Sequence, residues 1–136
     1  MGLVPLPSYR LFYLQVAEAL TAAHSKGVIH RDLKPDNIMI VQDQGDASRE
    51  QIKILDFGIA KMAESQGMGP SLAKTQVGVP MGTPLYMAPE QWLSSAQVDD
   101  KTDVYAVGVI LYEMLAGRTP FADRTTRESL AVAHIQ

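Results

Sequence analysis

The chain has 136 residues, and 46% of them are hydrophobic, which is enough for one domain with a buried core. Its 12 basic and 15 acidic residues give a net charge of −3, which argues against a nucleic-acid partner. The absence of cysteine excludes disulfides and thiolate metal sites and fits a cytoplasmic protein. The first eight residues do not form a signal peptide. The apolar stretch 104–115 is too short to cross a membrane, so no membrane partner is expected within this chain.

The first half of the chain has the patterns of one helix and two strands. Apolar residues recur every three or four positions over 9–25, which predicts an amphipathic helix that Ser8 caps and Gly27 ends. The β-branched run 38–41 and the run 51–55 predict two strands. The stretch between the strands is polar and rich in turn residues, so the strands are expected to form a hairpin.

The second half has one long irregular segment and two further helices. Residues 58–87 contain many glycines and prolines and show no periodicity, which is typical of a loop that is either functional or disordered. The charged stretch 99–103 opens a helix that is apolar on most faces, and this helix is therefore expected at the centre of the domain. Thr125 and Glu128 have the spacing of a capping box and predict the start of a last helix.

Three short motifs carry the chemistry. The sequence reads HRDLKPDN at 30–37, DFG at 56–58 and APE at 88–90. A single DFG triplet would be a weak indication of function, because such triplets arise by chance. Three motifs in this order are a strong indication of a catalytic site. Taken singly, their Asp and Asn side chains could simply cap turns.

Phosphoryl transfer explains why these residue types occur together. The reaction depends on positioning and on neutralising the charge of the transferred group. Asp32 can orient the acceptor hydroxyl and accept its proton, and Lys34 can offset charge near the γ-phosphate. Asn37 and Asp56 supply the oxygen ligands that Mg²⁺ prefers.

The chain resembles eukaryotic-type (Hanks-type) serine/threonine protein kinases, and its segments 88–91 and 108–121 are most similar to the bacterial members. The resemblance extends over about 9–134. It implies an α+β fold, the mainly helical C-terminal lobe of a kinase with a small β-hairpin, so that 1–136 would be a partial protein kinase domain. The catalytic loop, the DFG motif, the activation segment and the central helix would lie at 30–37, 56–58, 56–90 and about 103–116.

The resemblance also implies an activity and its cofactors. The parent enzyme would transfer the γ-phosphate of ATP, bound with Mg²⁺, to a Ser or Thr of a protein substrate. Thr83 would bridge Asp32 and Lys34 and favour a Ser or Thr hydroxyl. Met39 would pack beneath the adenine ring, with a place in the core of the hairpin as the alternative. The implied catalytic residues are Asp32, Lys34, Asn37, Asp56 and Thr83, and the implied nucleotide contacts are Lys34, Asn37, Met39 and Asp56.

Two regulatory residues follow from the same resemblance. Arg31 would bind a phosphate on the activation segment and thereby order it. Thr75 is the favoured acceptor of that phosphate, ahead of Ser65 and Ser71, and the alternative is an unmodified polar loop.

Further residues of the motifs have expected structural partners. His30 would pack against Phe57, and Asp103 would hold the backbone of the turn at 30–31. Glu113 would face either a basic residue of the substrate or a structural ion pair. Glu90 would normally pair with an arginine of a later helix, which this chain does not contain, and Glu90 is therefore expected to be unpaired.

The N-terminal lobe of the family has no counterpart in this sequence, which has neither a glycine-rich phosphate loop nor the lysine that contacts the α- and β-phosphates. Little or no kinase activity is therefore expected from the chain alone. The alternative is a non-catalytic, kinase-derived binding module or remnant. A small-molecule kinase of the aminoglycoside type is disfavoured, because such enzymes would not carry the motif at 88–90.

Overall fold

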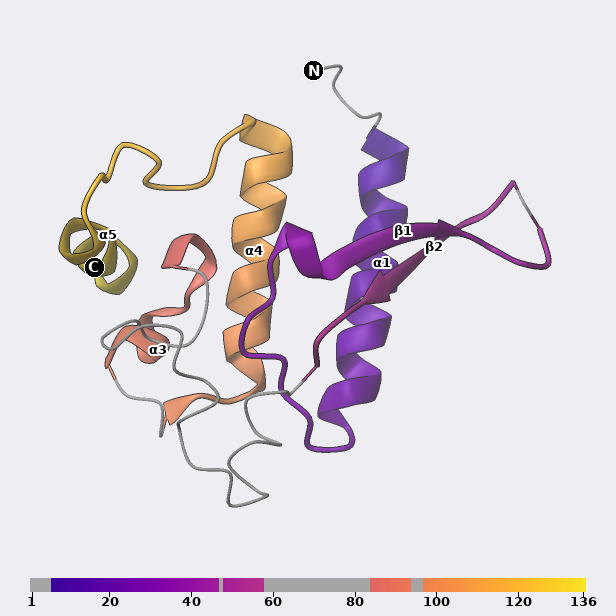
Figure 1. Ribbon diagram of the computed structural model, residues 1–136, viewed down its shortest axis with the longest axis horizontal. Helices are drawn as coiled ribbons and strands as arrows, with labels where there is room; N and C mark the ends of the chain where they lie inside the picture. Colours follow the sequence, from indigo (N-terminus) through magenta and orange to yellow (C-terminus); the bar gives the residue numbers. More distant parts are fainter. Residues whose placement is uncertain (1–5, 47, 58–83, 94–96) are drawn as a thin grey trace.

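The computed structural model describes residues 6–46, 48–57, 84–93 and 97–136. Over these residues the protein is mostly helical with one two-stranded antiparallel sheet, which confirms the predicted α+β class (Figure 1). The elements in chain order are α1 (Leu6–His24), η1 (Pro35–Asn37), β1 (Ile38–Gln42), β2 (Glu50–Ile54), η2 (Pro84–Tyr86), α3 (Pro89–Leu93), α4 (Asp100–Ala116) and α5 (Arg127–Ile135).

The two long helices, α1 and α4, lie side by side and run in opposite directions (Figure 1). The hydroxyl of Tyr9, near the start of α1, donates to the carbonyl of Met114 near the end of α4 at 3.5 Å. The apolar core forms between these helices and the loop that follows α1. Its buried members are Val16, Leu20, Leu33, Ala106 and Ile110. Burial of each large aliphatic side chain contributes about 1.5–3 kcal/mol, so this core holds the catalytic loop against both helices.

Helix α1 begins earlier than the sequence predicts. It starts at Leu6, so Ser8 lies inside the helix and does not cap it. The proline at position 7 does not prevent this, because the N–H groups of the first turn have no partner within a helix. The predicted end is confirmed: the helix stops at His24, and Gly27 has the left-handed φ of 71°.

The predicted hairpin is confirmed, with each strand displaced by one residue at one or both ends. Strands β1 and β2 pair antiparallel, with Ile38 opposite Ile54 and Ile40 opposite Ile52. Three of these four isoleucines pack against the core, whereas Ile40 is 58% exposed. The hairpin crosses α1 (Figure 1), and this places the residues before β1 and after β2 beside the catalytic loop.

Helix α4 ends where predicted but begins at Asp100, within the charged stretch that was expected to precede it, and its surroundings differ from the expectation. The carboxylate of Asp99 caps it by accepting from the N–H of Lys101 at 3.0 Å, and Gly117 ends it with a φ of 72°. One face is buried, but Val104 is 61% exposed and Leu115 is 54% exposed. Within the described residues, α4 is therefore covered on one side only.

The last helix has its cap one residue later than predicted. Thr126, not Thr125, is the N-cap of α5, and its reciprocal partner is Ser129 rather than Glu128. A serine hydroxyl can both donate and accept, so it closes the capping box as a glutamate would.

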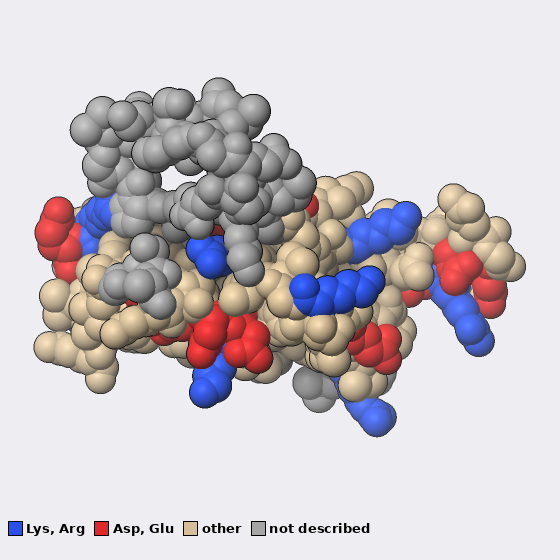
Figure 2. All heavy atoms as spheres, turned by 90° about the horizontal axis from the view of Figure 1, so that it is seen from below, with Lys and Arg blue, Asp and Glu red and all other residues tan. Residues whose placement is uncertain are grey.

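The charged side chains on the face in Figure 2 are of both signs. Among the described residues of this face, Lys and Arg side chains alternate with Asp and Glu side chains and do not gather into one basic patch. None of the helices in the described part of the chain is long and apolar enough to cross a membrane.

Candidate active site

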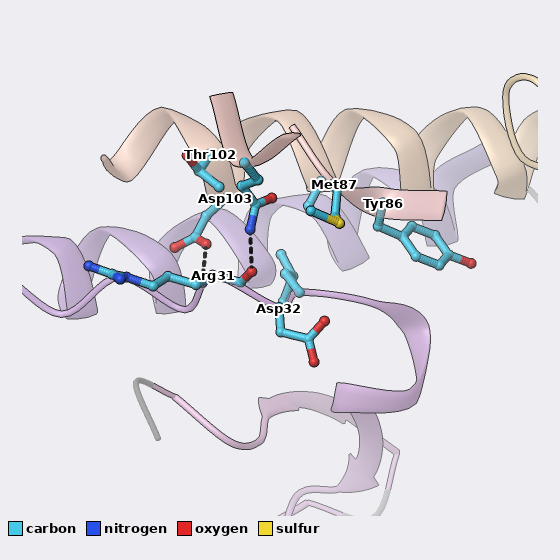
Figure 3. Close-up of a pocket in the computed structure, with 9 residues that line it drawn as sticks. Arg31, Asp32, Tyr86, Met87, Thr102 and Asp103 are labelled. Carbon is cyan, nitrogen blue, oxygen red and sulfur yellow. Dashed lines mark hydrogen bonds between the residues drawn. The ribbon is translucent and has the colours of Figure 1, made fainter. Parts of the chain in front are cut away.

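The catalytic loop is held at its start by one buried carboxylate. Asp103 of α4 is 1% exposed and accepts the backbone N–H groups of His30 and Arg31, each at 2.9 Å. Figure 3 shows the bond to Arg31. The same carboxylate lies 2.6 Å from Nε2 of His24, at the end of α1. The predicted role of Asp103 is confirmed, whereas its contact with His24 was not predicted.

The ring of His30 joins the catalytic loop to the segment that leads into Asp56. Nδ1 accepts the N–H of Asp32 at 3.2 Å, and Nε2 lies 2.7 Å from the carbonyl of Leu55. Because Nδ1 acts as an acceptor, Nε2 must carry the proton that is donated to Leu55. The ring also packs edge-on against Phe57, with centroids 5.0 Å apart, which confirms the expected contact.

Asn37 makes a second link between the same two segments. Its amide nitrogen donates to the carbonyl of Asp32 at 2.7 Å, and its backbone carbonyl accepts from the N–H of Leu55 at 2.8 Å. The side chain is largely buried, with 7% of the residue exposed. Since the amide nitrogen is engaged, the amide oxygen remains as the atom that could bind a cation.

Asp32 and Lys34 approach each other at the exposed side of the loop. Their Oδ2 and Nζ atoms are 3.7 Å apart, and the side chains are 38% and 25% exposed. In Figure 3 the Asp32 carboxylate points away from Asp103 and Met87. The carboxylate and the ammonium can therefore both reach a substrate from solvent.

Two non-glycine residues of the site have left-handed backbones. Arg31 has a φ of 70° and Asp56 a φ of 62°. Such conformations cost about 1–3 kcal/mol each and persist where the surroundings hold them, which is common at functional sites. Arg31 also has a buried Nε without a hydrogen-bond partner.

The other predicted site residues are either exposed or lie outside the described residues. Met39 is 48% exposed on β1, so the alternative that it belongs to the core of the hairpin is wrong. Asp56 is exposed, two residues after the end of β2. Thr83 and Thr75 lie outside the described residues, as do Ser65 and Ser71.

The donors near the catalytic loop fit a magnesium nucleotide. The carbonyl-type oxygen of Asn37 and the carboxylate of Asp56 are hard oxygen ligands, and Lys34 is a cation for a phosphate. The described residues contain no group of three His, Cys, Asp or Glu side chains that could hold a metal ion. The predicted ligands Asn37 and Asp56 are a different kind of set, because one of them is an asparagine.

The residues in and just before the APE motif make more hydrogen bonds than the sequence suggests. Glu90 was expected to lack its usual arginine partner, and its carboxylate accepts a hydrogen bond from the hydroxyl of Thr102 at 2.7 Å, because α4 brings that hydroxyl beside it. Glu113 accepts from the hydroxyl of Tyr86 at 2.7 Å. Burial, with the nearby Glu113 carboxylate, raises the pKa of Tyr86, so its hydroxyl remains a donor.

Gln91 is the functional candidate that sequence reasoning missed. Its side chain bonds the backbone of both Ala88 and Arg31, at 2.9 and 2.7 Å. A glutamine that follows the APE motif carries no recognisable pattern for this contact. Only the fold brings α3 to the catalytic loop.

Comparisons with known proteins agree with this geometry. The family described as "Protein kinase domain" matches residues 2–136. The chain is 50% identical over 120 residues to serine/threonine-protein kinase Pkn1 of Myxococcus xanthus, covering 88% of this chain and 16% of that protein. It is 51% identical over 107 residues to serine/threonine-protein kinase pkn3 of the same organism, covering 79% and 19%.

A relative from another bacterial group gives the same result. Serine/threonine-protein kinase PkaA of Streptomyces coelicolor is 42% identical over 120 residues, covering 88% of this chain and 20% of that protein. The chain thus spans a fifth or less of the length of these relatives. With the family matched over almost its whole length, the chain belongs to the protein kinase domain family and is homologous to serine/threonine protein kinases, mostly bacterial ones.

Proposed function

We propose that this chain supplies the catalytic loop and the metal-binding residues of a serine/threonine protein kinase. The reaction is transfer of the γ-phosphoryl group of ATP to a protein Ser or Thr hydroxyl, with release of ADP. The observation that carries the proposal is the hydrogen-bonded link between Asp32, Asn37 and Leu55. This link ties the two predicted metal ligands and the predicted base to one rigid unit, as a reaction that depends on positioning requires.

Each residue has one role in this proposal. Asp32 orients the acceptor hydroxyl and takes its proton as the new O–P bond forms. Lys34 offsets the negative charge of the transferred group, and its proximity to Asp32 supports this. Asn37 and Asp56 would hold Mg²⁺, which neutralises phosphate charge when bound. Met39, exposed on β1, would contact the adenine ring.

Regulation by phosphorylation forms part of the same proposal. Arg31 would bind the phosphate of a modified activation segment, with Thr75 as the favoured acceptor. The buried Nε of Arg31 supports this role, because a guanidinium N–H without an acceptor is costly and a phosphate oxygen would satisfy it. Thr83 would select the Ser or Thr hydroxyl.

The 136 residues alone are expected to be nearly inactive, because they supply only part of the phosphate-binding residues that the family uses. The test is ³²P transfer from Mg·ATP to a basic protein, with and without an N-terminal kinase lobe added in trans, and with Asp56→Asn as the matched control. The proposal predicts transfer only with the added lobe and only for the unmodified chain. Equal transfer by the Asp56→Asn variant would refute it.

A non-catalytic binding module is the second candidate. The specific observation in its favour is the exposed apolar surface of β1, where Met39 and Ile40 are 48% and 58% exposed. A module of this kind would bind the added lobe through the hairpin but would transfer no phosphate. Co-elution of the two on gel filtration without ³²P transfer would favour the module over the enzyme.

A further inference from the structure

The side-chain amide of Gln91 joins two separate stretches of backbone. Its Oε1 accepts the N–H of Ala88 at 2.9 Å, and its Nε2 donates to the carbonyl of Arg31 at 2.7 Å. Ala88 directly precedes α3, whereas Arg31 lies directly before Asp32 in the catalytic loop. The amide therefore connects the start of α3 to the peptide bond that leads into Asp32.

Only one of the two bonds is explained by the local needs of the helix. Gln91 is the third residue of α3, and its bond to Ala88 is half of a capping box. A glutamate would cap equally well and would suit the positive end of the helix dipole. The bond to the carbonyl of Arg31 needs an N–H donor, which glutamine has and an ionised glutamate lacks.

The bond from Gln91 acts on a residue with an unusual backbone. Arg31 has a φ of 70°, which residues with a Cβ rarely adopt. Its N–H is held by Asp103 of α4 at 2.9 Å, and its carbonyl is held by Gln91 of α3 (Figure 3). Arg31 is thus fixed on both sides by side chains from two helices. Without the Gln91 bond, the Arg31–Asp32 peptide would be held only at its N–H, which donates to Nδ1 of His30 at 3.2 Å.

We infer that Gln91 is a positioning residue for Asp32. By holding the carbonyl of Arg31 it fixes the Arg31–Asp32 peptide plane, and with it the direction of the Asp32 carboxylate. The contact stands independently of the reaction, and only its catalytic consequence rests on the proposed function. Because Gln91 directly follows the APE motif, it also transmits any displacement of that segment to Asp32.

Two substitutions separate the capping bond from the positioning bond. Gln91→Glu keeps an oxygen that accepts the N–H of Ala88, so the helix cap is retained. Its second carboxylate oxygen cannot donate to the carbonyl of Arg31, so the positioning bond is lost. Gln91→Met has a similar size and loses both bonds. Gln97→Met serves as the control, since Gln97 is exposed and lies outside α3.

The first readout is NMR of the 136-residue chain. In Gln91→Glu the amide hydrogen exchange of Ala88 is expected to stay as slow as in the unmodified chain, while the carbonyl ¹³C resonance of Arg31 shifts. In Gln91→Met both change, and in Gln97→Met neither does. An unshifted Arg31 carbonyl in Gln91→Glu and Gln91→Met would overturn the inference, whatever the activity of the chain.

The second readout is phosphotransfer with the N-terminal lobe added in trans. Both Gln91 variants are expected to lower kcat by about 10- to 100-fold, as small misplacements of catalytic groups do, with an unchanged KM for ATP. Wild-type kcat in Gln91→Glu would also overturn the inference. If the phosphotransfer rate of the unmodified chain does not exceed that of the Asp56→Asn variant, the proposed function has failed. The ¹³C resonance of the Arg31 carbonyl then still decides whether Gln91 holds the Arg31–Asp32 peptide.

Discussion

Asp103 and His30 shape the catalytic loop by binding its backbone. Asp103 accepts two backbone N–H groups and contacts His24. His30 bridges Asp32 and Leu55 through its two ring nitrogens. Buried polar groups of this kind are costly when they lose a partner, so their removal should affect stability as well as catalysis.

Asp103→Asn is expected to destabilise the fold strongly. One carboxylate oxygen becomes an NH₂ group that faces a backbone N–H or His24, and a buried donor is left without an acceptor. The expected loss is about 3 kcal/mol of unfolding free energy, measured by urea titration. Asp100→Asn, at an exposed position of α4, is the control and should change stability little. A loss below about 1 kcal/mol would contradict the account.

His30→Phe is expected to separate packing from hydrogen bonding. The phenyl ring can still pack against Phe57, but the N–H of Asp32 and the carbonyl of Leu55 lose their partners. The expected cost is about 1–3 kcal/mol in thermal or urea unfolding. Unchanged stability would mean that the ring contributes packing alone.

At the residue scale, the sequence proposes roles where the chemistry requires a residue type. Asp32, Asn37 and Asp56 were predicted as site residues because phosphoryl transfer requires such oxygens, and these roles stay predictions. The partner of Glu90 and the contacts of Gln91 could not be predicted. Both depend on which side chain an element distant in sequence brings within 3 Å, and no local pattern records that.

At the scale of elements, the hairpin packs on the core through its isoleucines, and one glutamine of α1 adds two hydrogen bonds to β2. The Gln15 amide donates to the carbonyl of Glu50 at 3.1 Å and accepts the N–H of Ile52 at 2.7 Å. These are edge groups of β2, which would otherwise lack a partner on that side. Because β2 leads into Asp56, this contact helps to fix the position of this proposed metal ligand relative to α1.

Gln15→Ala is therefore expected to cost about 1–2 kcal/mol of unfolding free energy and to speed hydrogen exchange at Ile52. Gln51→Ala, an exposed glutamine of the same hairpin, is the matched control and should behave like the unmodified chain. Equal effects of the two substitutions would show that the hairpin does not depend on the bond to α1.

Element types were predictable from periodicity, whereas their ends were less so. The hairpin and the long helices follow from the spacing of apolar residues and from Gly27 and Gly117. The cap of α5 was placed one residue early, because Thr125 and Thr126 are adjacent and only the backbone shows which hydroxyl faces the helix. Helix α3 is five residues long, too short for periodicity to reveal.

At the scale of the whole molecule, α5 is joined to the remainder of the chain through a buried histidine. His134 is 5% exposed, its Nδ1 lies 2.7 Å from the hydroxyl of Tyr105, and its ring stacks on Trp92. Phe121 packs against its edge, and the guanidinium of Arg127 lies over the Trp92 ring. These surroundings favour the neutral imidazole.

Burial accordingly lowers the pKa of His134 below its ordinary value of 6.5. The unfolded chain then binds this proton at a higher pH than the folded chain, so the contribution is fully present above about pH 6.5 and is lost as the pH falls through the folded pKa. Urea unfolding between pH 7.5 and 5 should show this loss. His134→Gln should have a smaller pH dependence, and an identical slope would contradict the assignment.

The overall arrangement was less predictable than its parts. The sequence predicted a central, buried α4, but Val104 and Leu115 are exposed on the side away from the core. An apolar side chain indicates that its burial would be favourable, but it does not indicate which part of the described chain would cover it.

The most direct test of the central claim is the phosphotransfer rate of Asp32→Asn, measured with ³²P-labelled Mg·ATP, a protein substrate and an N-terminal lobe added in trans. Asparagine keeps the shape of the side chain but cannot accept the hydroxyl proton. The account predicts a fall in kcat of about 10²-fold or more, with an unchanged thermal unfolding midpoint. Transfer by the variant at the rate of the unmodified chain would contradict the assignment of Asp32 and, with it, the proposed kinase site.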